Sequence, residues 1–337
     1  MDTTAARVRR TGRSVALVLA LAGCAAALAA CGSGPSPKKR VQSRAATDAL
    51  DNATALAGLG RAEDALAEFE RAIELNPLLS DAYLGAGDQH LLLGNHEDAL
   101  ADYQTATEIE PEDPDARVKY GRVLQILGRI GQAIGAYLAA LELEPSNVEA
   151  NINLSVAYMQ AEEPGLAVDY AERAVLLAPR DAAALINLGT IYAALDEHDD
   201  AVDQYQQAAE LVDPIPAELL INLAESLRAL RRDAEVVNVL SQLVRTHPSA
   251  IAWERLGSAQ FRLRNYDEAL VGFETALQYD EDHYPALNGL GVYLLNQYLW
   301  SDETNVAARD EGLKHLRRSL QLEHRQPPIR ELLARFR

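Results

Sequence analysis

Asparagines recur at nearly constant spacing in the middle of this 337-residue chain. Asn153, Asn187 and Asn222 are separated by 34 and 35 positions, and Asn288 lies further along. A side-chain amide offers a hydrogen-bond donor and an acceptor together, so it can pair with a peptide backbone whatever the peptide's sequence. Such a row suits the binding of an extended peptide, provided that the fold brings the amides onto one surface.

Two basic residues extend this pattern toward the N-terminus. Lys119 lies 34 positions before Asn153, and Arg122 follows it by about one helical turn. Both suit an acidic group, although the surrounding chain is acidic: residues 45–308 carry 45 acidic and 15 basic side chains, a net charge of −30, whereas residues 309–337 have a net charge of +4. An acidic body repels nucleic acid, so we expect no nucleic-acid partner.

Residue patterns typical of enzymes are lacking. The seven histidines are scattered, and His90 occupies a position expected in the core. The acidic stretch 196–200 resembles a metal site only in composition, because it lacks the spacing of a Ca²⁺ loop. The sequence contains no Walker loop, no Gly-x-Ser-x-Gly elbow and no His-Glu-x-x-His motif. We therefore expect neither catalysis nor a metal, a cofactor or a small-molecule substrate.

The N-terminus has the pattern of a secretory signal peptide. Several arginines precede an apolar run at 15–22, and small residues continue to Ala30. The tetrapeptides that end in Cys24 and Cys31, Leu-Ala-Gly-Cys and Leu-Ala-Ala-Cys, resemble the lipobox of bacterial lipoproteins. In that family the cysteine carries lipid, such as palmitate, and becomes the new N-terminus. The body has no further cysteine, so cysteine usage concerns processing and not folding.

Of the two cysteines, Cys31 is the preferred lipidation site and Cys24 is the alternative. Cleavage before Cys31 leaves a Gly-, Ser- and Pro-containing tether, whereas cleavage before Cys24 leaves an apolar stretch exposed. An uncleaved anchor is a further possibility, but the apolar segment 15–30 is shorter than the roughly 20 residues that span a bilayer. We expect a signal peptide at 1–30, a flexible tether at 31–45, and an exported, membrane-anchored protein on the periplasmic side or at the cell surface.

The elements that must position these side chains follow a 34-residue period. A small residue recurs with spacings of 34, 34, 34, 34, 35, 33 and 34. A second small residue follows twelve positions later in most repeats, then a large residue four further on, and a further small residue after another three. The first small residues are Ala53, Gly87, Gly121, Ser155, Gly189, Ala224, Gly257 and Gly291.

This helix–turn–helix pattern resembles the tetratricopeptide repeat over residues 46–326. The resemblance implies an all-α fold, a right-handed α-solenoid of about eight helical hairpins, with a capping helix at 327–337. Repeat six has Val236 and Leu243 where small residues are usual, which predicts a more splayed hairpin. Repeat eight is expanded, so residues 297–309 form either a longer turn or extended helix ends.

The same resemblance implies where the polar row lies. In tetratricopeptide proteins the slot of Asn153, Asn187 and Asn222 faces a concave groove, and in some members stacked asparagines there bind a peptide backbone. We therefore predict a peptide-binding groove made of these residues with Lys119, Arg122 and Asn288. The arrangement differs from the carboxylate clamp of chaperone-binding members, so recognition of heat-shock-protein tails is not supported.

These patterns predict a membrane-tethered scaffold that binds segments of partner proteins and assists the assembly of an envelope complex. Tetratricopeptide lipoproteins of similar layout act in pilus secretin assembly, outer-membrane biogenesis or regulation of cell-wall enzymes. The alternatives are a self-associating structural protein of the envelope and an accessory subunit of an enzyme or secretion system. The partner, the pathway and the membrane stay open at this stage.

Overall fold

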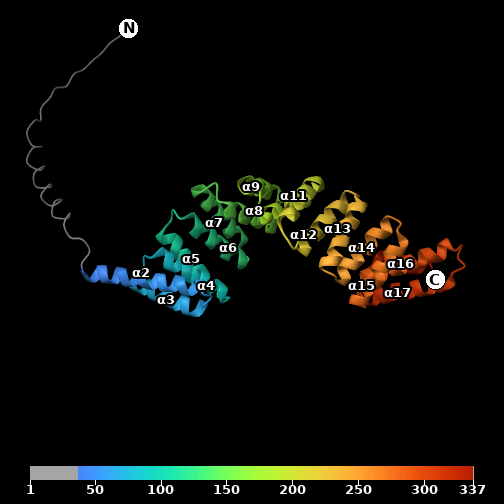
Figure 1. The fold of residues 1–337 in the computed structure, drawn as a ribbon, viewed down its shortest axis with the longest axis horizontal. Helices are drawn as coiled ribbons and strands as arrows, with labels where there is room; N and C mark the ends of the chain where they lie inside the picture. Colours follow the sequence, from blue (N-terminus) through green and yellow to red (C-terminus); the bar gives the residue numbers. More distant parts are fainter. Residues whose placement is uncertain (1–36, 337) are drawn as a thin grey trace, which may run out of the picture. The chain divides into compact units, whose positions relative to one another are not determined.

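The apolar periodicity of the chain produces helices throughout the described region. The computed structural model describes residues 37–336, with side chains from Ser43 onward, and within this range it contains seventeen helices and no strand (Figure 1). The helices are α2 (Pro37–Gly58), α3 (Ala62–Leu75), α4 (Ser80–Leu92), α5 (His96–Ile109), α6 (Pro114–Ile126), α7 (Ile130–Leu143), α8 (Val148–Gln160), α9 (Pro164–Leu177), α10 (Ala182–Ala194), α11 (His198–Leu211), α12 (Ala217–Ala229), α13 (Asp233–Thr246), α14 (Ala250–Arg262), α15 (Tyr266–Tyr279), α16 (Tyr284–Trp300), α17 (Val306–Leu322) and α18 (Pro327–Arg335).

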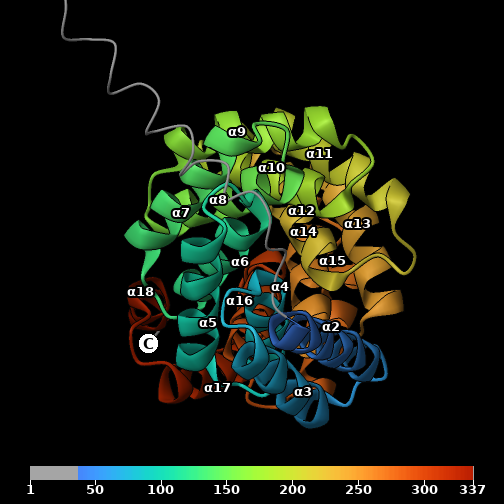
Figure 2. The ribbon, with the colours of Figure 1, turned by 90° about the vertical axis from the view of Figure 1, so that its left-hand side faces the viewer.

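Consecutive helices pair as hairpins, and each hairpin packs on the next within two compact bodies. The N-terminal body extends to Glu112 and holds repeats one and two; the C-terminal body begins at Asp113 and holds repeats three to eight with α18. In the C-terminal body the second helices α9, α11 and α13 lie outside, and the first helices α8, α10 and α12 lie within them (Figure 2). The expected all-α solenoid of stacked hairpins is confirmed.

Small residues let the two helices of a hairpin approach closely. The alanines at the crossings are completely buried: Ala65, Ala99, Ala133, Ala167, Ala201 and Ala269. In four repeats an aromatic ring of the second helix lies directly against a glycine of the first helix, where even a methyl group would collide with it. These pairs are Gly87–Tyr103, Gly121–Tyr137, Gly189–Tyr205 and Gly257–Phe273.

The turn inside each hairpin uses a left-handed backbone conformation. In repeats one to three a glycine adopts it, as at Gly94 with φ of 79°. In repeats four to seven residues with side chains adopt the same conformation, for example Glu162 with φ of 60° and Arg231 with φ of 58°. The turn geometry is thus retained in the later repeats at a cost in backbone strain.

Repeats six and eight depart from the regular pattern, as the sequence predicts. The helices α12 and α13 pack less closely than those of the other hairpins, because Val236 and Leu243 lie buried at their crossing. In repeat eight the helix ends are extended: α16 and α17 have 17 residues each, and residues 301–305 join them. The expansion therefore lengthens the hairpin and not only its turn.

The sequence predicts the last helix of the array correctly, but it does not predict where the first helix begins. Helix α2 begins at Pro37, so residues 37–45, which we expected to form part of a flexible tether, are helical. At the other end α18 begins at Pro327, the residue at which the sequence predicts the last helix to begin. Its apolar residues Ile329, Leu332 and Leu333 pack against the core of repeat eight.

Candidate functional site

The asparagines of the predicted groove lie on successive first helices of the C-terminal body: Asn153 on α8, Asn187 on α10 and Asn222 on α12. The amide of Asn187 reaches the preceding repeat, where its Nδ2 donates to Ser155 Oγ at 2.6 Å. The Nδ2 atom of Asn153 is enclosed and has no hydrogen-bond partner among the described residues. The row therefore retains donor and acceptor capacity, although part of it is used within the fold.

Asn222 lines a cavity of about 380 Å³ between α10 and α12. Thr190 and Tyr205 form one wall, and the Tyr205 hydroxyl donates to Thr190 Oγ1 at 3.2 Å. Burial raises the pKa of Tyr205, which therefore stays a neutral donor. An amide beside such a cavity is in a position to meet a peptide, and the binding role of Asn222 stays a prediction.

The two basic residues of the prediction both lie on α6. Arg122 pairs with Glu149 on α8, with 3.9 Å between Nη1 and Oε1, and both side chains are substantially exposed. Exposed pairs of this kind contribute at most about 1 kcal/mol, so the pair leaves Arg122 able to exchange its partner. Lys119 is half-buried one turn earlier on the same helix.

Asn288 lies elsewhere, at the C-terminal end of the array. Its Nδ2 donates to Gln326 Oε1 at 2.6 Å, and Gln326 in turn donates to Ser319 and to the backbone oxygen of Glu323. This chain of bonds ties α16 to the segment before α18. The structure therefore places Asn288 in the cap and not in the row of Asn153, Asn187 and Asn222.

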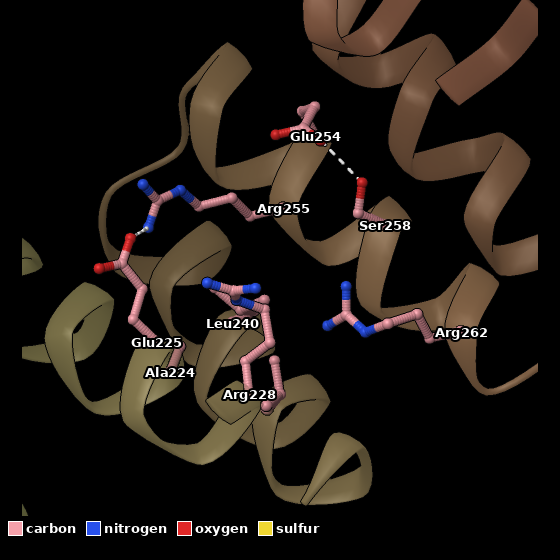
Figure 3. A pocket seen from close by; sticks show the side chains of 9 residues that line it. Ala224, Glu225, Arg228, Leu240, Glu254, Arg255, Ser258 and Arg262 are labelled. Carbon is pink, nitrogen blue, oxygen red and sulfur yellow. Dashed lines mark hydrogen bonds and ion pairs between the residues drawn. The ribbon is translucent and has the colours of Figure 1, made fainter. Parts of the chain in front are cut away.

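Candidate residues that the sequence prediction did not include line a second cavity, of about 260 Å³, between α12 and α14 (Figure 3). Three arginines surround it, Arg228, Arg255 and Arg262, and it shares Glu225 and Arg228 with the cavity at Asn222. The two cavities therefore lie next to each other. The arginines carried a signal in the sequence, since Arg255 occupies in repeat seven the slot that Asn222 occupies in repeat six.

We call this surface of the C-terminal body the inner groove, and define it by Asn153, Asn187, Asn222, Arg228 and Arg255. The first helices α8, α10, α12 and α14 position these residues, because one slot of a repeated helix returns to the same face in each repeat. Half-buried isoleucines lie next to the asparagines and give the groove apolar character: Ile152, Ile186 and Ile221.

The N-terminal body has a cavity of its own, of about 650 Å³, between α2 and α4. Its walls combine the apolar Leu50 and Leu84 with the carboxylates of Asp51, Asp81 and Asp88. This surface is acidic and therefore differs in charge from the inner groove of the C-terminal body.

The predicted lipidation sites, Cys24 and Cys31, lie outside the described residues. Among the helices between Pro37 and Arg335, none combines the length and the apolar character that crossing a membrane requires.

Stacked helical hairpins whose first helices line a groove define a class of repeat scaffold. The family models described as tetratricopeptide repeat match residues 50–117, 118–182 and 157–216, and also 250–283. The chain therefore belongs to the tetratricopeptide repeat family, whose members are generally non-enzymatic scaffolds that bind protein or peptide partners.

Solved structures of the same fold support this assignment. PilF of Pseudomonas aeruginosa superposes with a TM-score of 0.57 at 18% identity, over 66% of this chain and 99% of PilF. PilW, described as a widely conserved type IV pilus biogenesis factor, gives 0.56 at 20% identity, over 60% of this chain and 94% of PilW. A tetratricopeptide repeat protein from Parabacteroides merdae gives 0.53 at 14% identity, over 74% and 99% of the two chains. At these identities the likeness shows the fold. No curated protein sequence matches the chain.

Proposed function

We propose that this protein is a membrane-tethered scaffold that holds an extended segment of a partner protein in the inner groove during the assembly of an envelope complex. The observation that carries the proposal is that the cavity at Asn222 lies next to the arginine-lined cavity, with which it shares Glu225 and Arg228. Amides can form hydrogen bonds with any peptide backbone, and apolar side chains can pack against the aliphatic groups of the bound segment. Charged residues at one end of the groove can set the direction in which the segment lies.

The binding of a partner segment is tested by crosslinking in cells. In the test variant Asn153, Asn187 and Asn222 are changed to alanine, which is a better helix former than asparagine and therefore preserves the helices. The matched control changes two asparagines outside the row, the exposed Asn52 and Asn238. We expect the crosslinked partners to be lost from the test variant alone. Partners that are unchanged by the triple substitution would refute binding in the groove.

The tether is a separate part of the proposal and rests on the lipobox resemblance around Cys31. Metabolic labelling with a fatty acid tests it. We expect the label on the wild-type chain and on Cys24→Ala but not on Cys31→Ala. A label that is lost only from Cys24→Ala would move the lipid to the alternative site, and a wild-type chain without label would refute the tether.

A further inference from the structure

The arginine-lined cavity lies where repeat six has Leu240 in place of an aromatic residue. In repeats two and five the tyrosine of the second helix fills the space over the first helix and reaches its polar face: the hydroxyl of Tyr103 donates to Asp88 at 2.7 Å. Leu240 occupies this slot in repeat six and is too short to fill the same space. Correspondingly, α12 and α14 approach each other less closely than the neighbouring first helices do. A volume of about 260 Å³ is left open above Ala224.

The cavity combines an apolar floor with charged walls, in which three arginines lie beside the carboxylates of Glu225 and Glu254. Its floor consists of Ala224, Val236 and Leu240, all of them buried. Figure 3 shows Arg228 and Arg262 on opposite sides of the open space, with the guanidinium group of Arg228 turned toward the side of Glu225 and Arg255. This arrangement suits a group that has an aliphatic part and a negative end.

The ion pairs around the cavity involve two of its three arginines. Arg255 pairs with Glu225 at 2.8 Å, and Arg262 pairs with Asp233 at 2.7 Å. Within the described residues Arg228 has neither a hydrogen bond nor an ion pair, and the cavity also contains the carboxylate of Glu254, which accepts from Ser258 Oγ at 2.7 Å. Residues 217–264 carry seven basic and five acidic side chains, a net charge of +2, whereas residues 45–308 together have a net charge of −30. One guanidinium without a partner, in a cavity that already holds carboxylates, suits a single carboxylate better than a doubly charged phosphate.

The size of the cavity limits what can occupy it. Small-molecule pockets usually measure about 300–1,000 Å³, and 260 Å³ lies below that range. The volume accepts a side chain or the end of a chain, and the cavity lies next to the one that Asn222 lines. A segment lying in the inner groove would therefore insert one residue here.

We propose that the cavity between α12 and α14 binds a carboxylate of a partner segment, with the aliphatic part of that residue on Leu240 and Val236. Arg228 and Arg262 would hold the carboxylate oxygens, because a guanidinium has five donors and can serve two acids. The carboxylate comes either from a glutamate or aspartate side chain or from the C-terminus of the partner. This inference rests on the proposed function, since it names the chemistry of the segment that the groove holds.

The test uses random peptide libraries with free or blocked C-termini, selected on the immobilised full-length chain. We expect selected peptides to share an acidic residue, or a free C-terminus, next to an aliphatic residue. Replacing the carboxylate by an amide should weaken binding about tenfold or more, and added salt should weaken it further. The library with blocked C-termini distinguishes a side-chain carboxylate from a terminal one.

Matched variants locate the peptide on the chain. The double substitution Arg228→Gln and Arg262→Gln removes the charge, Leu240→Phe fills the space while both arginines remain, and Arg245→Gln changes an exposed arginine elsewhere on α13. We expect the first two variants to lose binding by about tenfold or more and the third to bind as the wild type does. Circular dichroism confirms that each variant is folded.

Several results would overturn the inference. Peptides without an acidic group, peptides that bind the arginine variants normally, or tighter binding of a phosphoserine version each exclude the carboxylate. Self-association of the wild type that the arginine variants abolish would make a second copy the occupant in place of a partner. Peptides that depend on the asparagines of the row but not on the arginines leave the proposed function standing. Peptides indifferent to both sets refute the two proposals together.

Discussion

Gly121 on α6 and Tyr137 on α7 show how tightly the hairpins are packed. A Cβ atom at Gly121 would lie 2.6 Å from Cε1 and 2.8 Å from Cδ1 of the tyrosine ring. The ring has no freedom to move away, because Tyr137 is completely buried and its hydroxyl donates to Gln125 Oε1 at 2.9 Å. Overpacking of this kind costs about 1–3 kcal/mol.

Alanine also favours a helix, and this effect opposes the clash. Replacing glycine by alanine inside a helix contributes about 0.5–1 kcal/mol of stability. We therefore expect Gly121→Ala to destabilise the C-terminal body by about 1–2 kcal/mol in net terms. Gly135→Ala on α7 is the matched control, since a Cβ atom there meets nothing within 4 Å. It should stabilise the protein by about 0.5–1 kcal/mol.

Urea unfolding followed by circular dichroism measures both changes. Because an array of repeats does not always unfold in one step, hydrogen exchange of the amides in α6 and α7 is the second measurement. Adding Tyr137→Leu to Gly121→Ala should recover part of the loss, because it recreates the combination of Ala224 with Leu240 that repeat six uses. The reasoning is wrong if Gly121→Ala is as stable as Gly135→Ala.

Three further predictions concern stability and its dependence on pH. Arg231→Gly should stabilise the chain by about 1 kcal/mol, because Arg231 has a left-handed backbone with φ of 58°; a lower urea midpoint would contradict this. Burial raises the pKa of Asp102 from 3.8 to about 6, so its ionised form opposes folding above pH 6, and this cost disappears as the pH falls toward about 4. Asp102→Asn should therefore stabilise the protein at neutral pH by up to about 3 kcal/mol. The urea midpoint of this variant should also change less between about pH 4 and about pH 6 than that of the wild type. If the urea midpoint depends on pH in the same way in both proteins, the effect is excluded. Asn288→Ala should remove the bond to Gln326 and loosen α18 by about 1–2 kcal/mol, visible as faster hydrogen exchange at 327–335; unaltered exchange would show that the bond does not hold the cap.

Much of the fold was predictable because the same pattern of small and large residues recurs in each repeat, so the repeats support one another's assignment. The crossing residues, the splayed sixth hairpin and the cap at Pro327 all follow from residue size and position along one period. The start of the array was not predictable in this way: α2 begins at Pro37, where no repeat precedes it to supply the pattern. Nor did the sequence distinguish a longer turn from longer helices in repeat eight.

The candidate site was predictable only in part. The slot of Asn153, Asn187 and Asn222 recurs with the period, so their common face follows from helical geometry. Their hydrogen bonds do not follow, because Asn187 and Ser155 are 32 positions apart and Asn288 and Gln326 are 38 apart. Local spacing cannot show which amide is already used within the fold.

The sequence alone predicts the order, length and pairing of the hairpins. This is possible because each small or aromatic residue packs within its own repeat or against the next one along the chain. The arginine-lined cavity is a product of the tertiary structure. It depends on what Leu240 leaves empty, on the approach of α12 to α14 and on the ion pairs formed around it. Empty space and the balance of charge around it arise only when separate helices are packed together, and for that reason only the folded chain revealed them.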